Sequence, residues 1–329
     1  MAKQTSKRAS KESARTPSSR KASSTAKGAK VTRVLCAMDL TATSHLVLAE
    51  AAELAQVYDA HLDVVHVVEQ WDKRYDFLVD DLTKSLTKEA KEKVQAELAR
   101  LSKTNPVPVN VIVKQGSAVD EIAKAMKERK PDMLVIGAYG GEPDSKEPLG
   151  TVAERLLALA PCSVLVYRPC PSTDIERILC ATDGSPTARI ALDWALDLAA
   201  REGLKSIDLV NAYQVPTGYI EAGMTYETAR AKMKKLHDED VAKILSKVKD
   251  FPMAILPVVD DGPAAEVVCQ NAEARRADLI VIGSRGRSVF ARFLLGSVTT
   301  KVVRNARTPV LVVKDETHKV GFIEALLAL

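Results

Sequence analysis

The chain contains 329 residues, of which 46% are hydrophobic and 4% aromatic, and it carries a formal net charge of +4. This length predicts two domains, and the apolar content suffices for packed α/β layers. No apolar run approaches the roughly 18 residues of a membrane span, and no apolar segment at the N-terminus resembles a secretory signal. We therefore expect a cytoplasmic protein without membrane contact. The five cysteines include no CxxC pair, which agrees with a reducing compartment and gives no sign of a metal site.

Residues 1–30 differ in composition from the rest of the chain. They include nine Lys or Arg, one acidic residue (Glu12) and no Val, Leu, Ile, Phe, Tyr or Trp. Such a segment buries too little apolar surface to offset the entropy cost of ordering, so we expect a disordered basic tail. A flexible solubilising tail is the simplest role. An arm that contacts nucleic acid or another polyanion is an alternative, and so is an organellar transit peptide, against which the lack of bulky apolar residues argues.

Residues 31–170 alternate short apolar runs with helical patterns, which predicts a first domain. The first apolar run ends at Asp39. Strands are predicted at residues 32–39, 62–68, 107–114, 132–137 and 163–167. Helices are predicted at residues 44–58 and about 80–102, after Gly116, and between Gly150 and the last strand.

Residues 171–314 repeat this order, which predicts a second domain of the same kind. Its first apolar run ends at Asp183, and Ser185 followed by Pro186 is typical of a helix start. Strands are predicted at residues 176–183, 206–212, 254–259, 278–283 and 309–313. Helices are predicted at residues 186–202 and about 224–248, after Gly262, and between Gly296 and the last strand. Residues 315–329 are predicted to form a C-terminal extension, whose short apolar stretch would pack on the body or on a partner.

Strands that alternate with helices predict a parallel sheet covered on both faces, with ligands beyond the carboxyl ends of the strands. A glycine pattern follows the fourth strand of each half at this edge. In the second half it consists of Gly283 and Gly286, then nine residues, then Gly296 and Ser297. The first half has Gly137, Gly140, Gly150 and Thr151 at the same spacing. Glycines at a strand-to-helix turn let backbone N–H groups approach a phosphate closely, so the pattern predicts two nucleotide-binding units.

With these motifs, residues 31–314 resemble a tandem of two universal stress protein domains. The resemblance implies that each half is a doubly wound, five-stranded parallel sheet of the adenine nucleotide alpha hydrolase-like kind. It also implies that the chain binds ATP without an evident catalytic base. Asp183 would hold the adenosine part, and the segment near Ala212 would line the base. Backbone at the glycines would approach the ribose and phosphates, which a helix start would cap; these residues are Gly283, Gly286, Gly296, Ser297 and Val298.

The loop between the glycines distinguishes the two halves. In the second half Arg285, Arg287 and Arg292 add positive charge that suits phosphate. In the first half the loop between Gly140 and Gly150 contains three acidic residues and two prolines instead. A carboxylate beside a phosphate is unfavourable by roughly 1 to 4 kcal/mol. The first half is therefore predicted to be a weaker or degenerate site, although its candidate residues persist: Asp39, Val67, Gly137, Gly140, Gly150 and Thr151.

The favoured function is a stress-response sensor or regulator that binds ATP, with or without magnesium, mainly in the second half. A nucleotide-free interaction scaffold that uses the basic tail and a slow ATPase are the alternatives. The chain has no Walker lysine motif, no Gly-x-Ser-x-Gly elbow and no regular metal spacing. Members of the family commonly dimerise through their last strands. We therefore expect Val164–Tyr167 and Val310–Val313 to pair within this chain as an internal pseudo-dimer, and a homodimer of the whole chain is an alternative.

Overall fold

The computed structural model describes residues 30–69, 76–101, 107–140, 149–170, 174–248, 251–286 and 295–315. The side chains of residues 76–83 and 101 are not described. Outside these ranges lie the predicted tail up to residue 29, the C-terminal extension beyond Asp315, and both loops between the glycines, residues 141–148 and 287–294. Arg287 and Arg292 therefore lie outside the described residues, as do the acids and prolines of the first loop.

The elements of the first half follow the predicted order. Its strands are β1 (Arg33–Met38), β2 (His61–Val68), β3 (Val109–Gln115), β4 (Met133–Gly137) and β5 (Ser163–Tyr167). Its helices are α1 (Ser44–Tyr58), α2 (Asp76–Leu101), α3 (Ala118–Arg129) and α4 (Thr151–Leu159).

The second half repeats this order. Its strands are β6 (Ile178–Ala181), β7 (Ser206–Tyr213), β8 (Ala254–Asp261), β9 (Leu279–Gly283) and β10 (Val310–Val313). Its helices are α5 (Pro186–Arg201), α6 (Tyr226–Ser246), α7 (Ala264–Arg275) and α8 (Ser297–Asn305), with a short 3-10 helix at Thr217–Tyr219.

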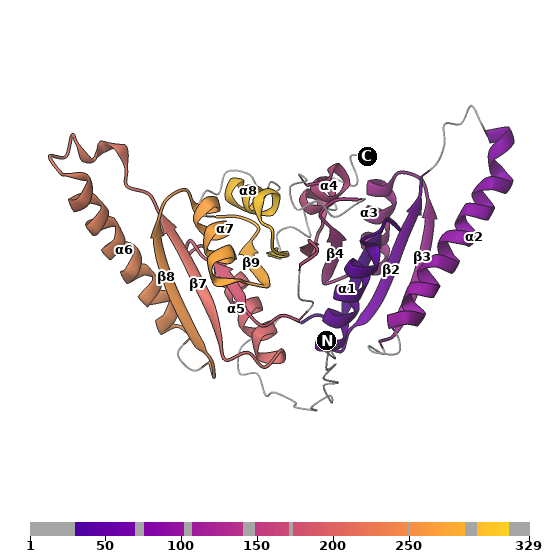
Figure 1. The fold of residues 1–329 in the computed structure, drawn as a ribbon, viewed down its shortest axis with the longest axis horizontal. Coiled ribbons are helices and arrows are strands. Elements are labelled where there is room, and N and C mark those ends of the chain that lie inside the picture. The colour runs from indigo at the N-terminus through magenta and orange to yellow at the C-terminus, as the bar shows by residue number, and fades with distance from the viewer. Residues whose placement is uncertain are drawn as a thin grey trace, which may run out of the picture.

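The strands join into a single ten-stranded sheet in the order β3-β2-β1-β4-β5-β10-β9-β6-β7-β8. Within each half all neighbouring strands run parallel, so each half is a doubly wound five-stranded unit, as predicted. The halves meet through the antiparallel pair β5 and β10, where Leu165 lies opposite Leu311. Pairing of the last strands within the chain is therefore confirmed. Figure 1 shows this arrangement, with α4 and α8 near the middle and α2 and α6 at the outer ends.

Alternation along the strands supplies a core on each face of the sheet. Cys36 packs in the core that α1, α2, α5 and α6 cover, and Cys180 lies in the same core. Leu35 points to the opposite core, which α3, α4, α7 and α8 cover. The strands read as almost continuous apolar runs because helices cover both faces of the sheet. The winding places the carboxyl ends of β1 and β4, and of β6 and β9, beside each other in each half.

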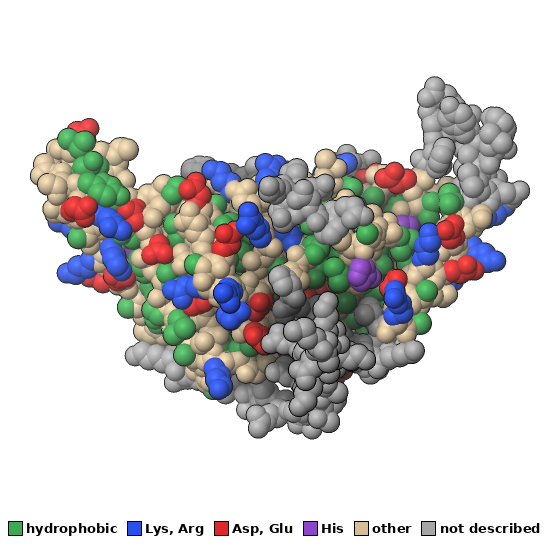
Figure 2. Space-filling model, viewed as in Figure 1, with side chains coloured by type: hydrophobic (Ala, Val, Ile, Leu, Met, Phe, Trp, Pro, Cys, Tyr) green, Lys and Arg blue, Asp and Glu red, His purple; other side chains and the backbone are tan. Residues whose placement is uncertain are grey.

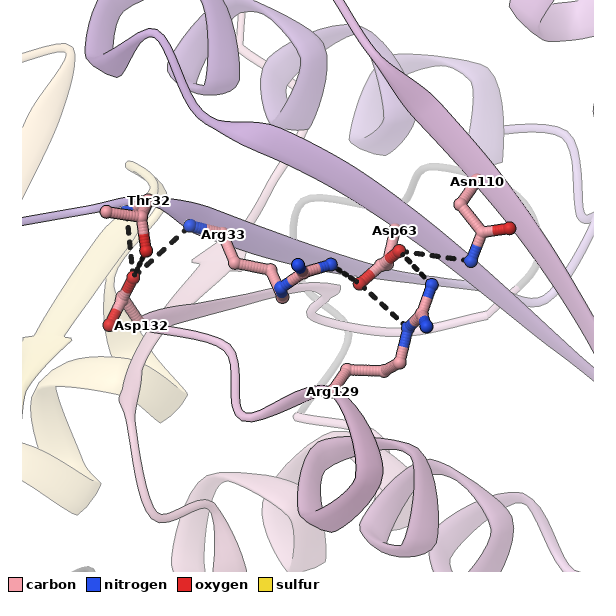
Figure 3. Close-up of polar contacts among 6 residues, drawn as sticks. All are labelled: Thr32, Arg33, Asp63, Asn110, Arg129 and Asp132. Atoms are coloured by element: carbon pink, nitrogen blue, oxygen red, sulfur yellow. Dashed lines mark hydrogen bonds and ion pairs between the residues drawn. The ribbon is translucent and has the colours of Figure 1, made fainter.

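A buried polar cluster stabilises the first half at the amino ends of its strands (Figure 3). The carboxylate of Asp63 is 1% exposed, and it accepts hydrogen bonds from Arg33 at 2.8 Å, Arg129 at 2.8 Å and Asn110 at 3.1 Å. Burial raises the pKa of Asp63, but the donors outweigh it and the net pKa is lowered. This cluster lies at the end of the sheet opposite the glycine turns, and its buried groups are paired with one another, so we assign it a structural role.

The two halves also touch through their helices. Arg201 of α5 lies 4.7 Å from the ring centre of Tyr58 in α1 and donates to the carbonyl of Val57. Arg304 of α8 forms an ion pair with Glu154 of α4. On the face drawn in Figure 2, Lys and Arg side chains are interspersed with Asp and Glu over both halves. The described part of that face therefore shows no extended basic patch.

Candidate functional site

The described residues of each half form a pocket at the carboxyl ends of the strands, where the sequence places the glycine turns. The pocket of the second half has a volume of about 360 Å³ and that of the first half about 350 Å³. Predicted residues that line the second pocket are Asp183, Ala212, Gly283, Arg285, Gly286, Gly296, Ser297 and Val298. Predicted residues that line the first pocket are Asp39, Val67, Gly137, Gly140, Gly150 and Thr151. The structure thus brings together every predicted site residue that it describes.

The second glycine of the pattern lies against the aspartate at the end of the first strand. A Cβ atom on Gly286 would stand 2.7 Å from Oδ2 of Asp183, and one on Gly140 would stand 2.7 Å from Oδ2 of Asp39. Real Cβ atoms do not approach an oxygen so closely, so any side chain here would displace the carboxylate. The sequence suggests these glycines only as points of ligand approach. The structure adds that they make room for the aspartate itself.

The first glycine differs between the halves. A Cβ atom on Gly283 would stand 3.0 to 3.1 Å from backbone atoms of Thr187 and Ala188, in the first turn of α5. A Cβ atom on Gly137 would meet only ordinary contacts at 3.4 Å, among them a methyl group of Val47. The second half therefore packs its first helix tightly on the end of β9, whereas the first half has room for a methyl group at the same point.

The third glycine starts a short helix in each half. Gly296 donates its N–H to the carbonyl of Ser284 at 2.8 Å, and Gly150 donates to Ala138 at 2.7 Å. Helices α8 and α4 begin at the next residue, and neither start has a side-chain cap. The first N–H groups of a helix have no partner within it and carry a partial positive charge that favours an anion. Ser297 and Val298 at the start of α8 line the second pocket, so this pocket presents an anion-binding helix end.

Thr299 secures α8 to the strand before it. Its hydroxyl is buried and donates to the carbonyl of Gly283 at 2.8 Å. The corresponding residue of the first half is Ala153, which has no such group. The sequence pattern of glycines and hydroxyls does not single out Thr299, because the bond depends on the angle between α8 and β9.

The two pockets differ more in the charge of their walls than in their shape. Arg285 lines the second pocket, and its guanidinium contacts Asp315 at 2.7 and 2.8 Å. Part of the positive charge predicted for Arg285 is therefore directed to Asp315. The first half has Tyr139 at this position, and it also brings the exposed Glu69 into the wall. In the wall that the structure describes, the first pocket has the carboxyl groups of Asp39 and Glu69 and no Lys or Arg.

The strand-end aspartates have different loops around them. Oδ1 of Asp39 accepts from the N–H of Thr41 at 3.0 Å, from the Thr41 hydroxyl at 2.7 Å and from the Ser44 hydroxyl. Oδ1 of Asp183 accepts from the N–H of Ser185 at 2.9 Å. The next residue adopts positive φ in both halves, 60° for Leu40 and 76° at the equivalent glycine. A leucine there is strained, whereas glycine is not.

The end of the second strand also differs. In the first half Nδ1 of His66 donates to the carbonyl of Met38 at 2.8 Å, and the ring lines the pocket. In the second half the amide of Asn211 donates to the carbonyl of Thr182 at 2.8 Å, and His237 contacts the same amide at 2.6 Å. His66 lies on β2, the strand next to β1 in the sheet. Its place in the pocket wall follows from the strand order, which the residue itself does not signal.

Each pocket helix is also anchored from the opposite half. Lys314, directly after β10, donates through Nζ to the carbonyls of Leu157 at 2.7 Å and Ala160 at 2.6 Å, at the end of α4. Arg168, directly after β5, donates to the carbonyls of Val303 at 3.2 Å and Arg304 at 3.4 Å, at the end of α8. Burial lowers the pKa of Lys314 to about 8. Cations at a helix C-terminus are favourable, so each half stabilises the helix that lines the other half's pocket.

The described part of the chain contains neither a metal-binding cluster nor a membrane-spanning helix. Among the residues that the structure describes, no group of three or more His, Cys, Asp or Glu is arranged to hold a metal ion. In the same residues, no helix has the length and apolar character needed to cross a membrane.

Several known proteins of similar sequence or fold are universal stress proteins. The model of the universal stress protein family matches at residues 30–168 and again at 174–314. A universal stress protein of Mycolicibacterium smegmatis is 28% identical over 292 residues, which cover 85% of this chain and 96% of that relative. One from Methanocaldococcus jannaschii is 30% identical over 139 residues, which cover 42% of this chain and 82% of that relative. The solved structure of an Archaeoglobus fulgidus universal stress protein has the same fold, with a TM-score of 0.64, 23% identity, and coverage of 86% of this chain and 98% of that one.

Proposed function

Because this chain belongs to the universal stress protein family, we propose that it is a cytoplasmic stress-response sensor or regulator that binds ATP in its second pocket. The observation that carries the proposal is the uncapped start of α8, which opens into a pocket of about 360 Å³. Its N–H groups and the hydroxyl of Ser297 are donors suited to phosphate oxygens. The pocket is deep enough for a small ligand and combines apolar walls with a few polar groups, as ligand sites usually do.

The proposal assigns a role to each part of the pocket. Asp183 accepts hydrogen bonds from ribose hydroxyls, because its carboxylate lies under the glycine turn at the base of the pocket. Apolar side chains near Ala212, among them Val210 and Val268, contact the flat face of the base. Gly283 and Gly286 leave the turn without side chains at these positions, so that the backbone approaches the ligand. The start of α8 then receives the phosphate groups, with Arg285 adding positive charge.

Magnesium would enter this pocket with the nucleotide. The described wall offers one carboxylate, Asp183, and hydroxyl groups such as that of Ser297. Magnesium bound to ATP takes most of its oxygen ligands from phosphates and water and needs few from the protein. The donor set therefore fits a magnesium–ATP complex better than a metal site made by the protein alone.

The experiment is to denature the purified protein and identify released nucleotide by chromatography. A Gly296→Glu variant places a carboxylate at the start of α8 and should lose the nucleotide. The matched Gly150→Glu variant changes the equivalent residue of the first half and should retain most of it. Both glycines have φ near −64°, which glutamate adopts without backbone strain. A Cβ atom would stand 3.3 Å from the carbonyl oxygen of Ser284 at Gly296 and 3.4 Å from that of Ala138 at Gly150, so a Gly296→Ala variant controls for the slightly closer contact. If neither change alters nucleotide content, the proposal is wrong.

A further inference from the structure

We propose that the first pocket binds a nucleoside without a polyphosphate chain, so that the two halves take different ligands. This inference rests on the proposed function, because it assumes that the shared pocket shape accepts a nucleoside. The described walls of the two pockets share their nucleoside-facing residues and differ near the helix start.

The parts of the pocket that would hold a nucleoside are present in both halves. The volumes are about 350 and 360 Å³, and in each the strand-end aspartate lies under the second glycine. Asp39 keeps Oδ2 beside Gly140, while its Oδ1 is occupied by Thr41 and Ser44. A carboxylate oxygen held at the base of a pocket is a suitable acceptor for a ribose hydroxyl. Apolar side chains that would contact a base are also present: Ala37, Val67, Ala118, Ile122 and Ile136.

The parts that would hold phosphates are changed. Tyr139 stands where the second half has Arg285, and its ring faces the guanidinium of Arg168 at 5.6 Å. Strand register places Glu69 at the position of Gln214, which adds a carboxyl group to the wall. The described wall of the first pocket therefore has two carboxyl groups and no Lys or Arg, whereas the second has Asp183 with Arg285.

The helix that starts at the first pocket is also less suited to phosphate. Helix α4 has Glu154 in its own first turn, while the first turn of α8 has no acidic residue. Glu154 also pairs with Arg304, so it offsets the positive end of α4 only in part and matters less than Glu69 and Tyr139. Both side-chain changes and the helix charge thus disfavour a polyphosphate, and neither removes the nucleoside part of the pocket.

The test measures adenosine and ATP binding calorimetrically in variants that leave one pocket intact. In Ala212→Trp, whose larger side chain fills the base end of the second pocket, adenosine should bind at least about tenfold more tightly than ATP. In Val67→Trp, the equivalent change in the first pocket, ATP should bind more tightly than adenosine. Should Ala212→Trp fail to fold, Ala264→Trp fills the same pocket from α7.

A second arm converts the first pocket toward the second. In the Ala212→Trp background, Glu69→Gln combined with Tyr139→Arg should raise ATP affinity about tenfold and leave adenosine affinity nearly unchanged. Equal binding of ATP and adenosine by Ala212→Trp, or binding of neither, would overturn the inference. Failure of ATP to bind Val67→Trp would instead overturn the proposed function, so the two failures are distinguishable.

Discussion

The two halves share a backbone and differ in the side chains that complete it. Both place an aspartate under a glycine turn, and both start a short helix at the third glycine. The second half adds Arg285 and an anchoring hydroxyl on Thr299, while the first adds Glu69. Glycine spacing therefore specifies the shape of this pocket, and a few side chains around the glycines decide which ligand the pocket suits.

The largest expected effect is a pH dependence that belongs to the first half. Glu50 of α1 is buried, and burial, with the nearby charges of Glu53 and Glu202, raises its pKa from 4.5 to about 8. The folded protein therefore holds a proton that the unfolded chain has released. This contribution to stability is full below pH 4.5 and is lost as the pH rises through 8, by roughly 5 kcal/mol in total.

The substitution Glu50→Gln keeps the side chain neutral at every pH, so it should flatten the dependence of unfolding free energy on pH between 4.5 and 8. Urea titrations of wild type and variant across this range provide the measurement. Glu221→Gln, at an exposed position of the second half, serves as the control and should leave the slope unchanged. A slope that Glu50→Gln also leaves unchanged would show that Glu50 does not hold a proton in the folded protein over this range.

The next effect concerns the anchors that each half supplies to the other. Lys314→Met leaves buried carbonyls at the end of α4 without a donor, which should lower the unfolding free energy by about 2 to 3 kcal/mol. Arg168→Met removes longer bonds, at 3.2 and 3.4 Å, and should cost less. Thermal or urea unfolding of both variants measures which loss of stability is larger. A larger loss in Arg168→Met would show that hydrogen-bond length does not set the contribution of each anchor.

A smaller effect tests the packing of the first glycine. Gly283→Ala forces a methyl group against the backbone of Thr187 and Ala188, so it should cost about 1 to 3 kcal/mol. Gly137→Ala meets only ordinary contacts, so it should cost less than about 1 kcal/mol. Equal losses in the two urea titrations would contradict the difference in tightness between the halves.

The smallest effect concerns Thr299. Thr299→Val removes the hydroxyl bond to Gly283 and leaves the volume nearly unchanged, which should cost about 1 kcal/mol of stability. Because α8 then moves relative to the turn, ATP affinity should also fall, while adenosine binding to the first pocket should not. Calorimetric titration of each ligand separates these effects, and unchanged ATP affinity would remove Thr299 from the site.

Much of the fold could be predicted because each half repeats the same local patterns. The helix predicted at 44–58 is α1, and Ser185 caps α5 ahead of Pro186. The boundaries that moved are at edge strands and long charged helices, such as β8, which extends to Asp261. There the apolar pattern is weak because one side of the element faces solvent.

The contacts that could not be predicted are those between distant segments. Asp315 reaches Arg285 only because β10 pairs with β9, and Lys314 reaches α4 only because β10 also pairs with β5. The register of two strands sets such contacts, and no local spacing encodes them. The residues between the glycines predicted that the halves are unequal, while contacts such as that of Asp315 with Arg285 became visible only in the structure.

The central claim is that the second pocket binds ATP and the first does not. A crystal structure of the protein grown with ATP and magnesium tests it most directly. We expect a triphosphate at the start of α8, within hydrogen-bonding distance of Ser297, and no triphosphate at Thr151. A triphosphate at the start of α4, or phosphates placed away from α8, would contradict the account.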